Sequence, residues 1–389
     1  MINFDKSKYK LAIGLLSGTS VDGIDAVLIK IKGSGVNTNI KIIDFQTYPI
    51  NSNLRRMILK NSSKHTSNVF EICGLNSLLG KEFANSGLKL IKKNNLKPSQ
   101  IVFIGSHGQT IHHIPSKKYF GIKSTLQIGD PSVISNVTGI TTVGDYRIAD
   151  CSVDGDGAPL VSFLDYILFT SKTKNRLLLN IGGISNFTVL KKNAKRDDVI
   201  AFDTGPGNMI IDGVIKKLFK KNYDRNGEVA FKGKMSKILF SFLRNDSYYK
   251  LKPPKSTGRE FYGEIFQKRL LNRCKGISQN DIIYTISEFT SYSIHYNYKK
   301  FVSNKIKVDE LFVSGGGAKN NFLMKRLKYY FKGVRVKELH QSGLTSDNKE
   351  AVLFAVLANE CLCGNAANMP NVTGAKRNVI LGKICQGEL

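Results

Sequence analysis

The hydrophobic pattern of the chain alternates short apolar runs with longer stretches in which apolar residues recur every three or four positions. Apolar runs that end in glycine-containing turns are typical of strands, and the longer stretches are typical of helices. Strands are predicted at residues 9–16, 25–31, 39–48, 101–105, 176–183, 199–205 and 310–317. Helices are predicted at residues 68–93, 158–169, 208–220, 279–294, 320–331 and 349–362. This alternation predicts an α/β protein whose sheets are flanked by helices.

The order of the predicted strands indicates a duplication. The first three strands are joined by short turns, which predicts an antiparallel meander, and a second set of strands begins at residue 176. A meander followed by αβ units, and then a second set, predicts two α/β domains. We expect an N-terminal domain at residues 1–148, onto which residues 368–389 pack back, and a C-terminal domain at residues 149–367.

Composition excludes several classes of protein. Of the 389 residues, 41% are hydrophobic and 23% are charged, as in ordinary soluble domains. No apolar window reaches the roughly 18 residues needed to cross a bilayer, so we expect no membrane partner. The cysteines have no paired spacing, which disfavours disulfides or a zinc site and favours thiols in a reducing cytoplasm. They are Cys73, Cys151, Cys274, Cys361, Cys363 and Cys385.

The net charge first suggests a polyanionic partner. Lys and Arg number 58 against 30 Asp and Glu, which gives a formal net charge of +28. Much of the excess lies between the glycine-rich motifs, for example in LIKKNNLK and VIKKLFKKNY, and predicts solvated helix faces and loop tips. We therefore expect the charge to attract small anions, and we expect no nucleic-acid partner.

A polar glycine turn, GTSVDGID, lies between the first two predicted strands. Its backbone N–H groups and hydroxyls can wrap a phosphate because no large side chain blocks the approach. Asp22 and Asp25 would then lie near a hydrated magnesium ion or orient the turn. A plain hairpin with Asx turns is the alternative. The turn comprises Gly18, Thr19, Ser20, Val21, Asp22, Gly23, Ile24 and Asp25.

Two motifs in the second half carry a similar signal. LNIGGISN places Gly182 and Gly183 at a turn after an apolar strand, and FDTGPGN places Asp203 at a strand end. A carboxylate held there by a fixed backbone can act as a general base. The alternative is a helix N-cap, but Asp203 lies too far before the helix that begins near Asn208. The base is therefore the preferred interpretation.

VSGGGAKNN leads from a strand through three glycines into a helix. Gly315, Gly316 and Gly317 let the backbone lie against a flat or anionic group, and the helix that follows near Asn320 adds a favourable dipole for phosphate. The motif is neither G-x-G-x-x-G nor a Walker A sequence. Dinucleotide enzymes and P-loop enzymes are both disfavoured.

A third group of polar residues lies at strand ends and loops of the first half. Neutral donors and acceptors with one cation suit a hydroxyl-rich ligand that carries an acid group. His107 could instead be a satisfied core histidine, and His112 and His113 are expected at the surface because no third metal ligand is evident. The group comprises Ser106, His107, Gln109, Gln127, Asp130, Asp145 and Arg147.

As a set, these motifs resemble the anhydro-N-acetylmuramic acid kinase family. GLLSGTSVDGIDAVLI, GSHGQTIHHIP, TLQIGDP, DGAPLV, LNIGGISNFT, FDTGPGN, PPKSTGRE, VSGGGAKN, KEAVLFAVLA and NVTGAKRNVILGKI follow in order over nearly the whole chain. The resemblance implies the fold of actin, sugar kinases and heat-shock ATPases: two α/β domains, each on a mixed five-stranded sheet, that close on ATP and Mg²⁺ in a cleft. It also implies a homodimer.

The implied reaction converts 1,6-anhydro-N-acetylmuramic acid, ATP and water into N-acetylmuramic acid 6-phosphate and ADP, in the recycling of cell-wall sugars. By motif match, residues 18–25 bind phosphate, and Asp203 is the catalytic aspartate that activates the water. The nucleotide would be lined by Gly182, Gly183, Gly315, Gly316, Gly317 and Asn320.

Substrate contacts are assigned on the same resemblance. Arg147 is expected at the lactyl carboxylate and Gln109 and His107 at hydroxyls, with Ser106 and Asn186 as further substrate residues. Two assignments stay open. Glu350 either helps hold the metal through water, as Asp22 would, or caps a helix. The segment KSTGRE, Lys255–Glu260, could cap a helix, line the nucleotide entrance or support a dimer.

Three alternatives compete with this function. A kinase for a neutral anhydrosugar such as levoglucosan would share the fold and Asp203. A non-catalytic ATPase-fold scaffold is disfavoured because Asp203 is present. A nucleic-acid binder is disfavoured because no recognised module or aromatic-basic pattern occurs.

Overall fold

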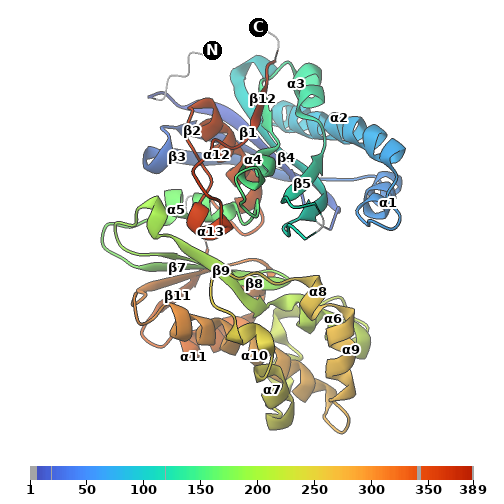
Figure 1. Ribbon diagram of the computed structural model, residues 1–389, viewed down its shortest axis with the longest axis vertical. Helices are drawn as coiled ribbons and strands as arrows, with labels where there is room; N and C mark the ends of the chain where they lie inside the picture. The colour runs from blue at the N-terminus through green and yellow to red at the C-terminus, as the bar shows by residue number, and fades with distance from the viewer. Residues whose placement is uncertain (1–6, 19, 119, 340–342, 388–389) are drawn as a thin grey trace. The chain divides into compact units, whose positions relative to one another are not determined.

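The structure is a computed structural model that describes residues 7–18, 20–118, 120–339 and 343–387. It divides into two compact units, Met1–Leu168 with His340–Leu389 and Phe169–Leu339 (Figure 1). The sequence placed the boundaries after residues 148 and 367 instead. They differ because helix α12 (Lys349–Leu362) packs on strands β1 (Lys10–Ser17) and β4 (Ile101–Ile114) of the first unit.

The first unit is built on a seven-stranded mixed sheet. Its other strands are β2 (Gly23–Lys32), β3 (Asn39–Pro49), β5 (Ser124–Ile128), β6 (Thr142–Gly144) and β12 (Lys383–Cys385). The order is β12-β6-β4-β1-β2-β3, and β5 pairs with β4. β1, β2 and β3 form the predicted antiparallel meander, while β4 runs parallel to both β1 and β6.

The second unit repeats this plan in a five-stranded sheet. Its strands are β7 (Arg176–Ile181), β8 (Ile184–Leu190), β9 (Ile200–Pro206), β10 (Glu310–Ser314) and β11 (Arg335–Glu338). β7, β8 and β9 form an antiparallel meander, and β10 runs parallel to β7 and to β11. The order β9-β8-β7-β10-β11 thus matches β3-β2-β1-β4-β6 strand for strand. The predicted α/β class, mixed sheets and duplication are confirmed, with β5 and β12 added to the first sheet.

All six predicted helices are present, although the bounds of most differ from the predicted ones. They are α2 (Val69–Lys93), α5 (Val161–Phe169), α6 (Asn208–Phe219), α10 (Gln279–Phe301), α11 (Asn321–Tyr330) and α12. The sequence did not predict the remaining helices, which have ten residues or fewer. They are α1 (Ser52–Asn61), α3 (Pro131–Thr138), α4 (Tyr146–Cys151), α7 (Lys237–Arg244), α8 (Arg259–Tyr262), α9 (Glu264–Asn272) and α13 (Pro370–Thr373).

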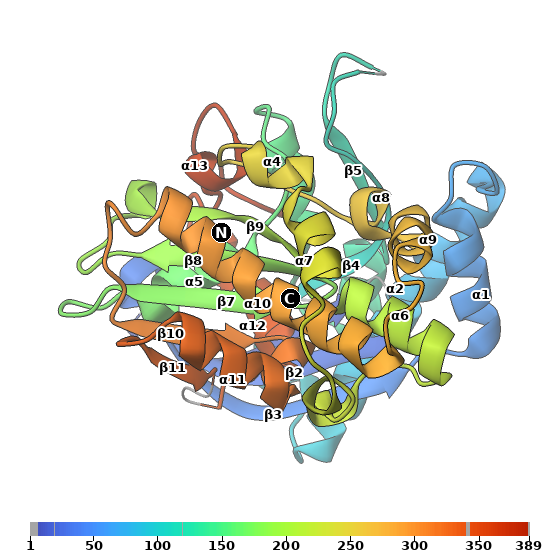
Figure 2. The ribbon, with the colours of Figure 1, turned by 90° about the horizontal axis from the view of Figure 1, so that it is seen from below.

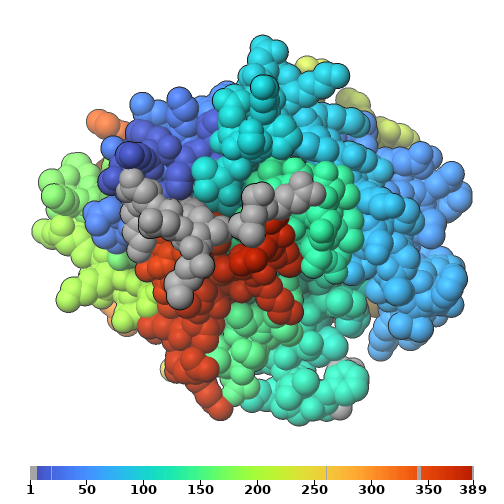
Figure 3. All heavy atoms as spheres, turned by 90° about the horizontal axis from the view of Figure 1, so that it is seen from above, coloured from blue at the N-terminus to red at the C-terminus, as the bar shows by residue number. Residues whose placement is uncertain are grey.

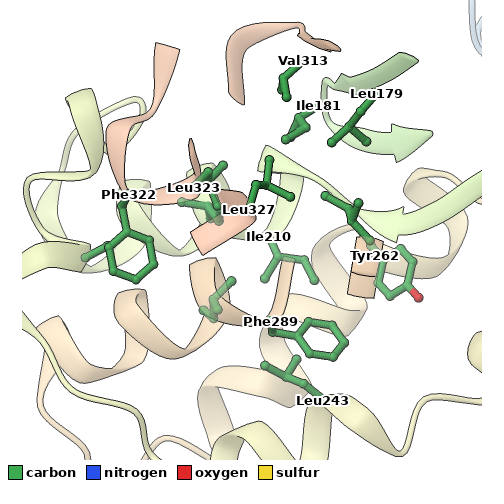
Figure 4. Packing of buried hydrophobic residues seen from close by; sticks show 14 of the residues in the cluster. Leu179, Ile181, Ile210, Leu243, Tyr262, Phe289, Val313, Phe322, Leu323 and Leu327 are labelled. Atoms are coloured by element: carbon green, nitrogen blue, oxygen red, sulfur yellow. The ribbon is translucent and has the colours of Figure 1, made fainter. Parts of the chain in front are cut away.

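Each unit has its own apolar core. In the second unit, Leu179 and Ile181 of β7 and Val313 of β10 belong to one buried cluster with Ile210 of α6 and Phe289 of α10 (Figure 4). Helices α6 and α10 contact this sheet at β8 and β9 (Figure 2). A separate buried cluster in the first unit joins the meander to α2. Each sheet therefore provides a rigid base for the loops at its strand ends.

Helix α12 lies directly on the first sheet because the strands beneath it carry glycines. Gly14 of β1 and Gly105 of β4 are neighbours in the parallel register. A methyl group on Gly14 would overlap the carbonyl oxygen of Ala351, and one on Gly105 would overlap that of Phe354. Only glycine lets the helix backbone approach this closely.

The C-terminal segment completes the first unit. β12 pairs antiparallel with β6, and Ser135 Oγ donates to the carbonyl oxygen of Gln386 at 2.6 Å. Figure 3 shows this segment in red beside the green segment that contains α3 and β6. All six cysteines are present as thiols. Among the described residues, no helix is long and apolar enough to span a membrane.

Candidate active site

A polar cavity of about 290 Å³ lies in the first unit, at the end of β1 and beside the middle of β4. Five of the residues singled out from the sequence line it: Gly18, His107, Gln109, Arg147 and Glu350. The rest of the lining comes from Leu16, Ser17, Thr110, Ala158, Pro159, Leu160, Val161, Leu353 and Phe354. Hydroxyl, amide and charged groups thus meet apolar side chains, which is the mixture that a sugar ligand requires.

Two buried polar atoms of this cavity lack partners. Ser17 and Gln109 are each 1% exposed, and within the described residues neither Ser17 Oγ nor Gln109 Oε1 has a hydrogen-bond partner. They are neighbours in the β1–β4 register. An unpaired buried acceptor is costly unless a ligand or water satisfies it. The pair therefore fits hydroxyl groups of a ligand.

The sequence singled out Gln109 but not Ser17. A signal existed, because Ser17 is the polar residue at which the apolar run of β1 ends. Its pairing with Gln109 depends on how two distant strands align, and the sequence pattern does not give that register.

His107 and Arg147 form a rigid pair. Arg147 Nε donates to His107 Nε2 at 2.9 Å, and His107 Nδ1 lies 3.0 Å from the carbonyl oxygen of Gly108. Because arginine only donates, Nε2 is the acceptor and Nδ1 carries the proton. Burial and the neighbouring Arg147 charge lower the pKa of His107 well below its usual value, so the ring is neutral. Both ring nitrogens already have hydrogen-bond partners. His107 therefore has no free nitrogen for the predicted hydrogen bond to a sugar hydroxyl.

The guanidinium of Arg147 keeps donors for a ligand. Its Nη1 donates to the carbonyl oxygen of Gly157 at 2.7 Å, and together with the His107 bond this uses two of its five N–H groups. Burial lowers the pKa of Arg147, whereas Glu350 raises it. Desolvation by the surrounding protein raises the pKa of Glu350, and the Arg147 charge opposes that rise. The residue still has an exposed surface. A fixed cation and a carboxyl group thus face one cavity.

The turn after β1 is shorter than predicted. Gly23, Ile24 and Asp25 belong to β2, and Thr19 lies outside the described residues. Val21 adopts a φ of 55°, which is unfavourable for a β-branched residue, and its N–H donates to the Gly18 carbonyl oxygen at 3.1 Å. Strain of this kind is common in loops that bind ligands.

The two acidic residues of that motif have other partners. Asp22 is exposed and pairs with Arg55 at 3.3 Å, and Arg55 also donates to the Ser20 carbonyl oxygen at 3.0 Å. Asp25 accepts from Thr47 Oγ1 at 2.6 Å, and burial raises its pKa. Both therefore anchor the turn to its surroundings.

Ser106 does not line the first cavity. It is 2% exposed and lines a different cavity of about 230 Å³, together with Gln127, Asp130 and Asp145. The register of β4 against β1 shifts between Ser106 and Gln109, and the two residues line different cavities. The structure therefore gives no support to Ser106 as a residue of the same site.

A larger cavity of about 390 Å³ lies in the second unit, between α6 and the start of α11. Of the predicted nucleotide residues it contains Gly316 and Asn320. The side chain of Asn320 accepts from Phe322 N and Leu323 N, so it also caps α11. The sequence missed the remaining lining, which is Asn208, Ile211, Asp212, Tyr223, Asp224, Arg225, Asn226 and Lys319.

Two carboxyl groups shape this cavity. Asp224 accepts from Val229 N at 2.9 Å and Ala230 N at 3.0 Å, so its oxygens hold the chain in place. Burial, with the nearby Asp224 charge, raises the pKa of Asp212 to about 7. Near neutral pH its carboxyl group is therefore partly protonated, and it can both donate to and accept from a hydroxyl such as that of a ribose.

The predicted glycines act through close backbone packing. Gly315 has a φ of +80°, and a methyl group there would lie 2.6 Å from the Ile181 carbonyl oxygen. Gly316 is open toward the cavity apart from Asn208 at 3.4 Å. The carbonyl oxygens of Gly182 and Gly183 accept from Asn208 N at 2.8 Å and Met209 N at 3.0 Å, and thus cap α6. A backbone surface of this kind suits a planar or anionic group.

Asp203 lies on β9 and is not a helix cap, because Gly207 is the N-cap of α6. Its Oδ2 accepts from Thr257 N at 2.9 Å. Its backbone N–H donates to the Lys255 carbonyl oxygen at 3.1 Å, and Asn186 lies opposite it in the β8–β9 register. The carboxylate is therefore fixed in direction while its side chain is only partly buried.

Comparison with known proteins identifies the family. The family model described as anhydro-N-acetylmuramic acid kinase matches residues 10–387. The chain belongs to this family. Two relatives named anhydro-N-acetylmuramic acid kinase are similar over nearly their full length. That of Caldanaerobacter subterraneus subsp. tengcongensis is 45% identical over 96% of this chain and 96% of its own. That of Francisella tularensis subsp. novicida is 46% identical over 97% of this chain and 99% of its own.

Two solved structures of other proteins show distant similarity. An activator of the 2-hydroxyisocaproyl-CoA dehydratase from Clostridium difficile with bound ADPNP is 13% identical, covers 90% of this chain and 94% of its own, and has a TM-score of 0.43. A ROK family glucokinase from Streptomyces griseus in complex with glucose and AMPPNP is 9% identical, covers 90% and 99%, and has a TM-score of 0.40.

An anhydro-N-acetylmuramic acid kinase that uses ATP is expected to need Mg²⁺, so the side chains that could bind this ion bear on its function. Within the described ranges, no three His, Cys, Asp or Glu side chains gather to hold an ion. Asp22 is committed to Arg55. Mg²⁺ typically keeps several waters and binds through substrate phosphates with one or two carboxylates, so the donor set fits only an ion carried by a nucleotide.

Proposed function

We propose that this protein opens the 1,6-anhydro ring of anhydro-N-acetylmuramic acid and transfers the γ-phosphoryl group of ATP to O6, giving N-acetylmuramic acid 6-phosphate and ADP. The family match over residues 10–387 carries the proposal. The polar cavity of the first unit, with its two unpartnered buried acceptors, supports a sugar ligand. We place the reaction in the cytoplasm, where ATP is available.

The chemistry couples hydrolysis to phosphorylation because the anhydro sugar has no free 6-hydroxyl. Asp203 takes a proton from a water molecule, whose oxygen bonds to C1. The electron pair of the C1–O6 bond moves onto O6. O6 then bonds to the γ-phosphorus while the bond to the β,γ-bridging oxygen breaks and ADP leaves. The proposal requires the sugar held by the first unit to be presented to Asp203 of the second during turnover.

Substrate recognition is assigned to the first cavity. Arg147 would bind the lactyl carboxylate through its remaining N–H groups, since a guanidinium matches a carboxylate in geometry and charge. Ser17 and Gln109 would bind sugar hydroxyls. His107 would hold Arg147 in place, and Glu350 would contact a hydroxyl or a metal-bound water.

ATP is assigned to the second cavity and the glycine turns. Asp212 would bind the ribose, and Gly316 would lie against the nucleotide. Residues Gly18–Asp22 would contact phosphate through backbone N–H groups. Mg²⁺, when bound to ATP, supplies neutralisation of phosphate charge, and Glu350 is the candidate carboxylate for one of its waters.

Asp203→Asn tests the role of the general base. The amide keeps the size of the side chain but does not accept a proton, so sugar phosphate formation is expected to fall by about a thousandfold. ADP release and sugar phosphate are both measured with ATP, Mg²⁺ and anhydro-N-acetylmuramic acid, and ATP binding is measured by calorimetry. Exposed Asp197 of the same unit supplies the matched control, Asp197→Asn, which should behave as wild type.

The outcomes separate the hypotheses. Full activity of Asp203→Asn would remove the general-base assignment. Wild-type protein that leaves anhydro-N-acetylmuramic acid unchanged would overturn the function itself. Faster turnover of levoglucosan would favour the neutral-sugar kinase.

A further inference from the structure

The segment before α8, residues 253–258, binds both the backbone and the side chain of Asp203. Asp203 N donates to the Lys255 carbonyl oxygen at 3.1 Å, and Thr257 N donates to Asp203 Oδ2 at 2.9 Å. One carboxylate oxygen is therefore held by a backbone amide. The other oxygen, Oδ1, is oriented by the same contact.

Lys255 brings a buried cation into the segment that holds this carboxylate. The residue is 9% exposed, and its ammonium lies 4.5 Å from the ring centroid of Tyr248 and 4.9 Å from that of Phe301. Its Nζ also donates to the Tyr248 carbonyl oxygen at 3.5 Å. Aromatic faces stabilise a cation but do not neutralise it. A buried cation is costly without a counter-charge, and the negative charge of Asp203 favours the protonated form of Lys255.

Tyr248 connects the aromatic cage to Asp203. Its hydroxyl donates to the Asp203 carbonyl oxygen at 2.7 Å, while its ring lies under the Lys255 ammonium. In addition, Thr257 Oγ1 is buried and has no hydrogen-bond partner among the described residues. This hydroxyl belongs to the residue whose N–H holds Oδ2. It is therefore available to a water that Asp203 activates.

We propose that Lys255 is a positioning residue that keeps Asp203 ionised and correctly oriented, and that the Thr257 hydroxyl provides a second contact for the attacking water. The inference rests on the proposed function and assigns a role to the KSTGRE segment, which the sequence left open. Lys255 acts through Asp203 and touches no reacting atom.

The charged neighbours of Lys255 make this role visible in the pH dependence. Burial and the Lys300 charge lower the pKa of Lys255 to about 8, while Asp203 opposes that change. Tyr248, the other titratable group that faces Lys255, has a pKa raised by burial and stays neutral. As pH rises through about 8, Lys255 loses its proton and Asp203 loses its neighbouring cation. As pH falls, Asp203 takes up its own proton, and the Lys255 cation delays this.

The experiment compares pH profiles of kcat/KM for the sugar in four proteins. In Lys255→Met, the midpoint of the acidic limb should rise by about one pH unit, and the alkaline limb near pH 8 should disappear. The kcat of this variant should fall about tenfold. In Lys300→Met, the alkaline limb should instead move to higher pH, because one repulsive charge on Lys255 is removed. Lys299→Met removes a neighbouring exposed lysine on α10 and should leave both limbs in place.

A second readout is independent of turnover. Carboxyl-carbon NMR of Asp-labelled protein, with Asp203→Asn used for assignment, should show Asp203 protonating at higher pH in Lys255→Met than in wild type. Thr257→Val should lower kcat about tenfold, and Thr257→Ser should restore it. If the wild type is active and Lys255→Met has the same pH limbs and the same NMR titration as wild type, the inference is overturned while the proposed function stands. An inactive wild type overturns the proposed function, whereas the NMR titration still decides the role of Lys255.

Discussion

At the scale of single residues, the arrangement of charge in the first cavity depends on the hydrogen bond from Arg147 to His107. Burial and the nearby Arg147 charge lower the pKa of His107 and keep it neutral, and the neutral ring accepts from Arg147 Nε at 2.9 Å. Phe354 packs against the other side of the imidazole, with ring centroids 4.5 Å apart. The guanidinium therefore has one orientation before any ligand binds, which reduces the entropy cost of binding.

Arg147→Ala should impair recognition of the acidic sugar. Loss of a charged contact to the lactyl carboxylate costs about 2 kcal/mol, or roughly a thirtyfold rise in KM for anhydro-N-acetylmuramic acid. KM for ATP and turnover of 1,6-anhydro-N-acetylglucosamine, which lacks the carboxylate, should change little. Steady-state kinetics on both sugars provide the measurement. Arg56→Ala is the control, because Arg56 is exposed and contacts Asn53. Equal losses on both sugars would contradict the lactyl assignment.

At the scale of elements, the glycines of β1 and β4 determine where α12 lies. This helix carries Glu350, Leu353 and Phe354 into the first cavity. Gly14 and Gly105 are register neighbours, so the sheet presents a flat glycine surface under the helix backbone. The position of the cavity wall thus follows from two residues that do not line it.

Gly105→Ala should destabilise the first unit by about 2–3 kcal/mol, because the new methyl group overlaps the backbone carbonyl of Phe354 and a backbone cannot swing aside. KM for the sugar should rise as α12 shifts. Gly74→Ala, at an exposed position of helix α2, is the matched control. No atom lies within 4 Å of its added methyl, so it should stabilise by about 1 kcal/mol. Thermal unfolding of both variants gives the comparison, and a Gly105→Ala protein as stable as wild type would refute the close-packing argument.

Local patterns predicted much of the fold. The first meander and helices α2 and α12 follow from periodicity within one segment. β8 was missed because Ser185, Asn186 and Thr188 interrupt its apolar run. For the site, His107, Gln109 and Arg147 were found as polar residues at strand ends. Their pairing, the separation of Ser106 and the part played by Ser17 depend on strand register and side-chain direction, which arise only when distant segments pack.

At the scale of the whole molecule, one strand order occurs twice and each unit has its own core and its own cavity. The duplication separates two tasks. Under the proposed function, the first unit offers hydroxyl acceptors and a cation, and the second offers glycine turns and Asp203. Each set of residues is therefore held by its own sheet, and a substitution in one core should leave the local geometry of the other intact.

The charge of +28 also acts at this scale. Lysine pairs stand in the last turns of α2, α6 and α10, where they complement the helix dipoles and remain exposed. These six lysines account for part of the excess, and they contribute to a long-range attraction for anions. Exposed charges are screened over about 10 Å at 0.1 M salt and about 3 Å at 1 M.

Salt should therefore weaken capture of the acidic sugar. Between about 0.05 and 0.5 M KCl, kcat/KM for anhydro-N-acetylmuramic acid is expected to fall severalfold, because screening removes the attraction between the carboxylate and the basic protein. The value for 1,6-anhydro-N-acetylglucosamine should fall less, since that sugar is neutral. Both are measured at saturating ATP, so that nucleotide binding does not contribute. An identical salt dependence for the two sugars would show that the net charge plays no part in capturing the substrate.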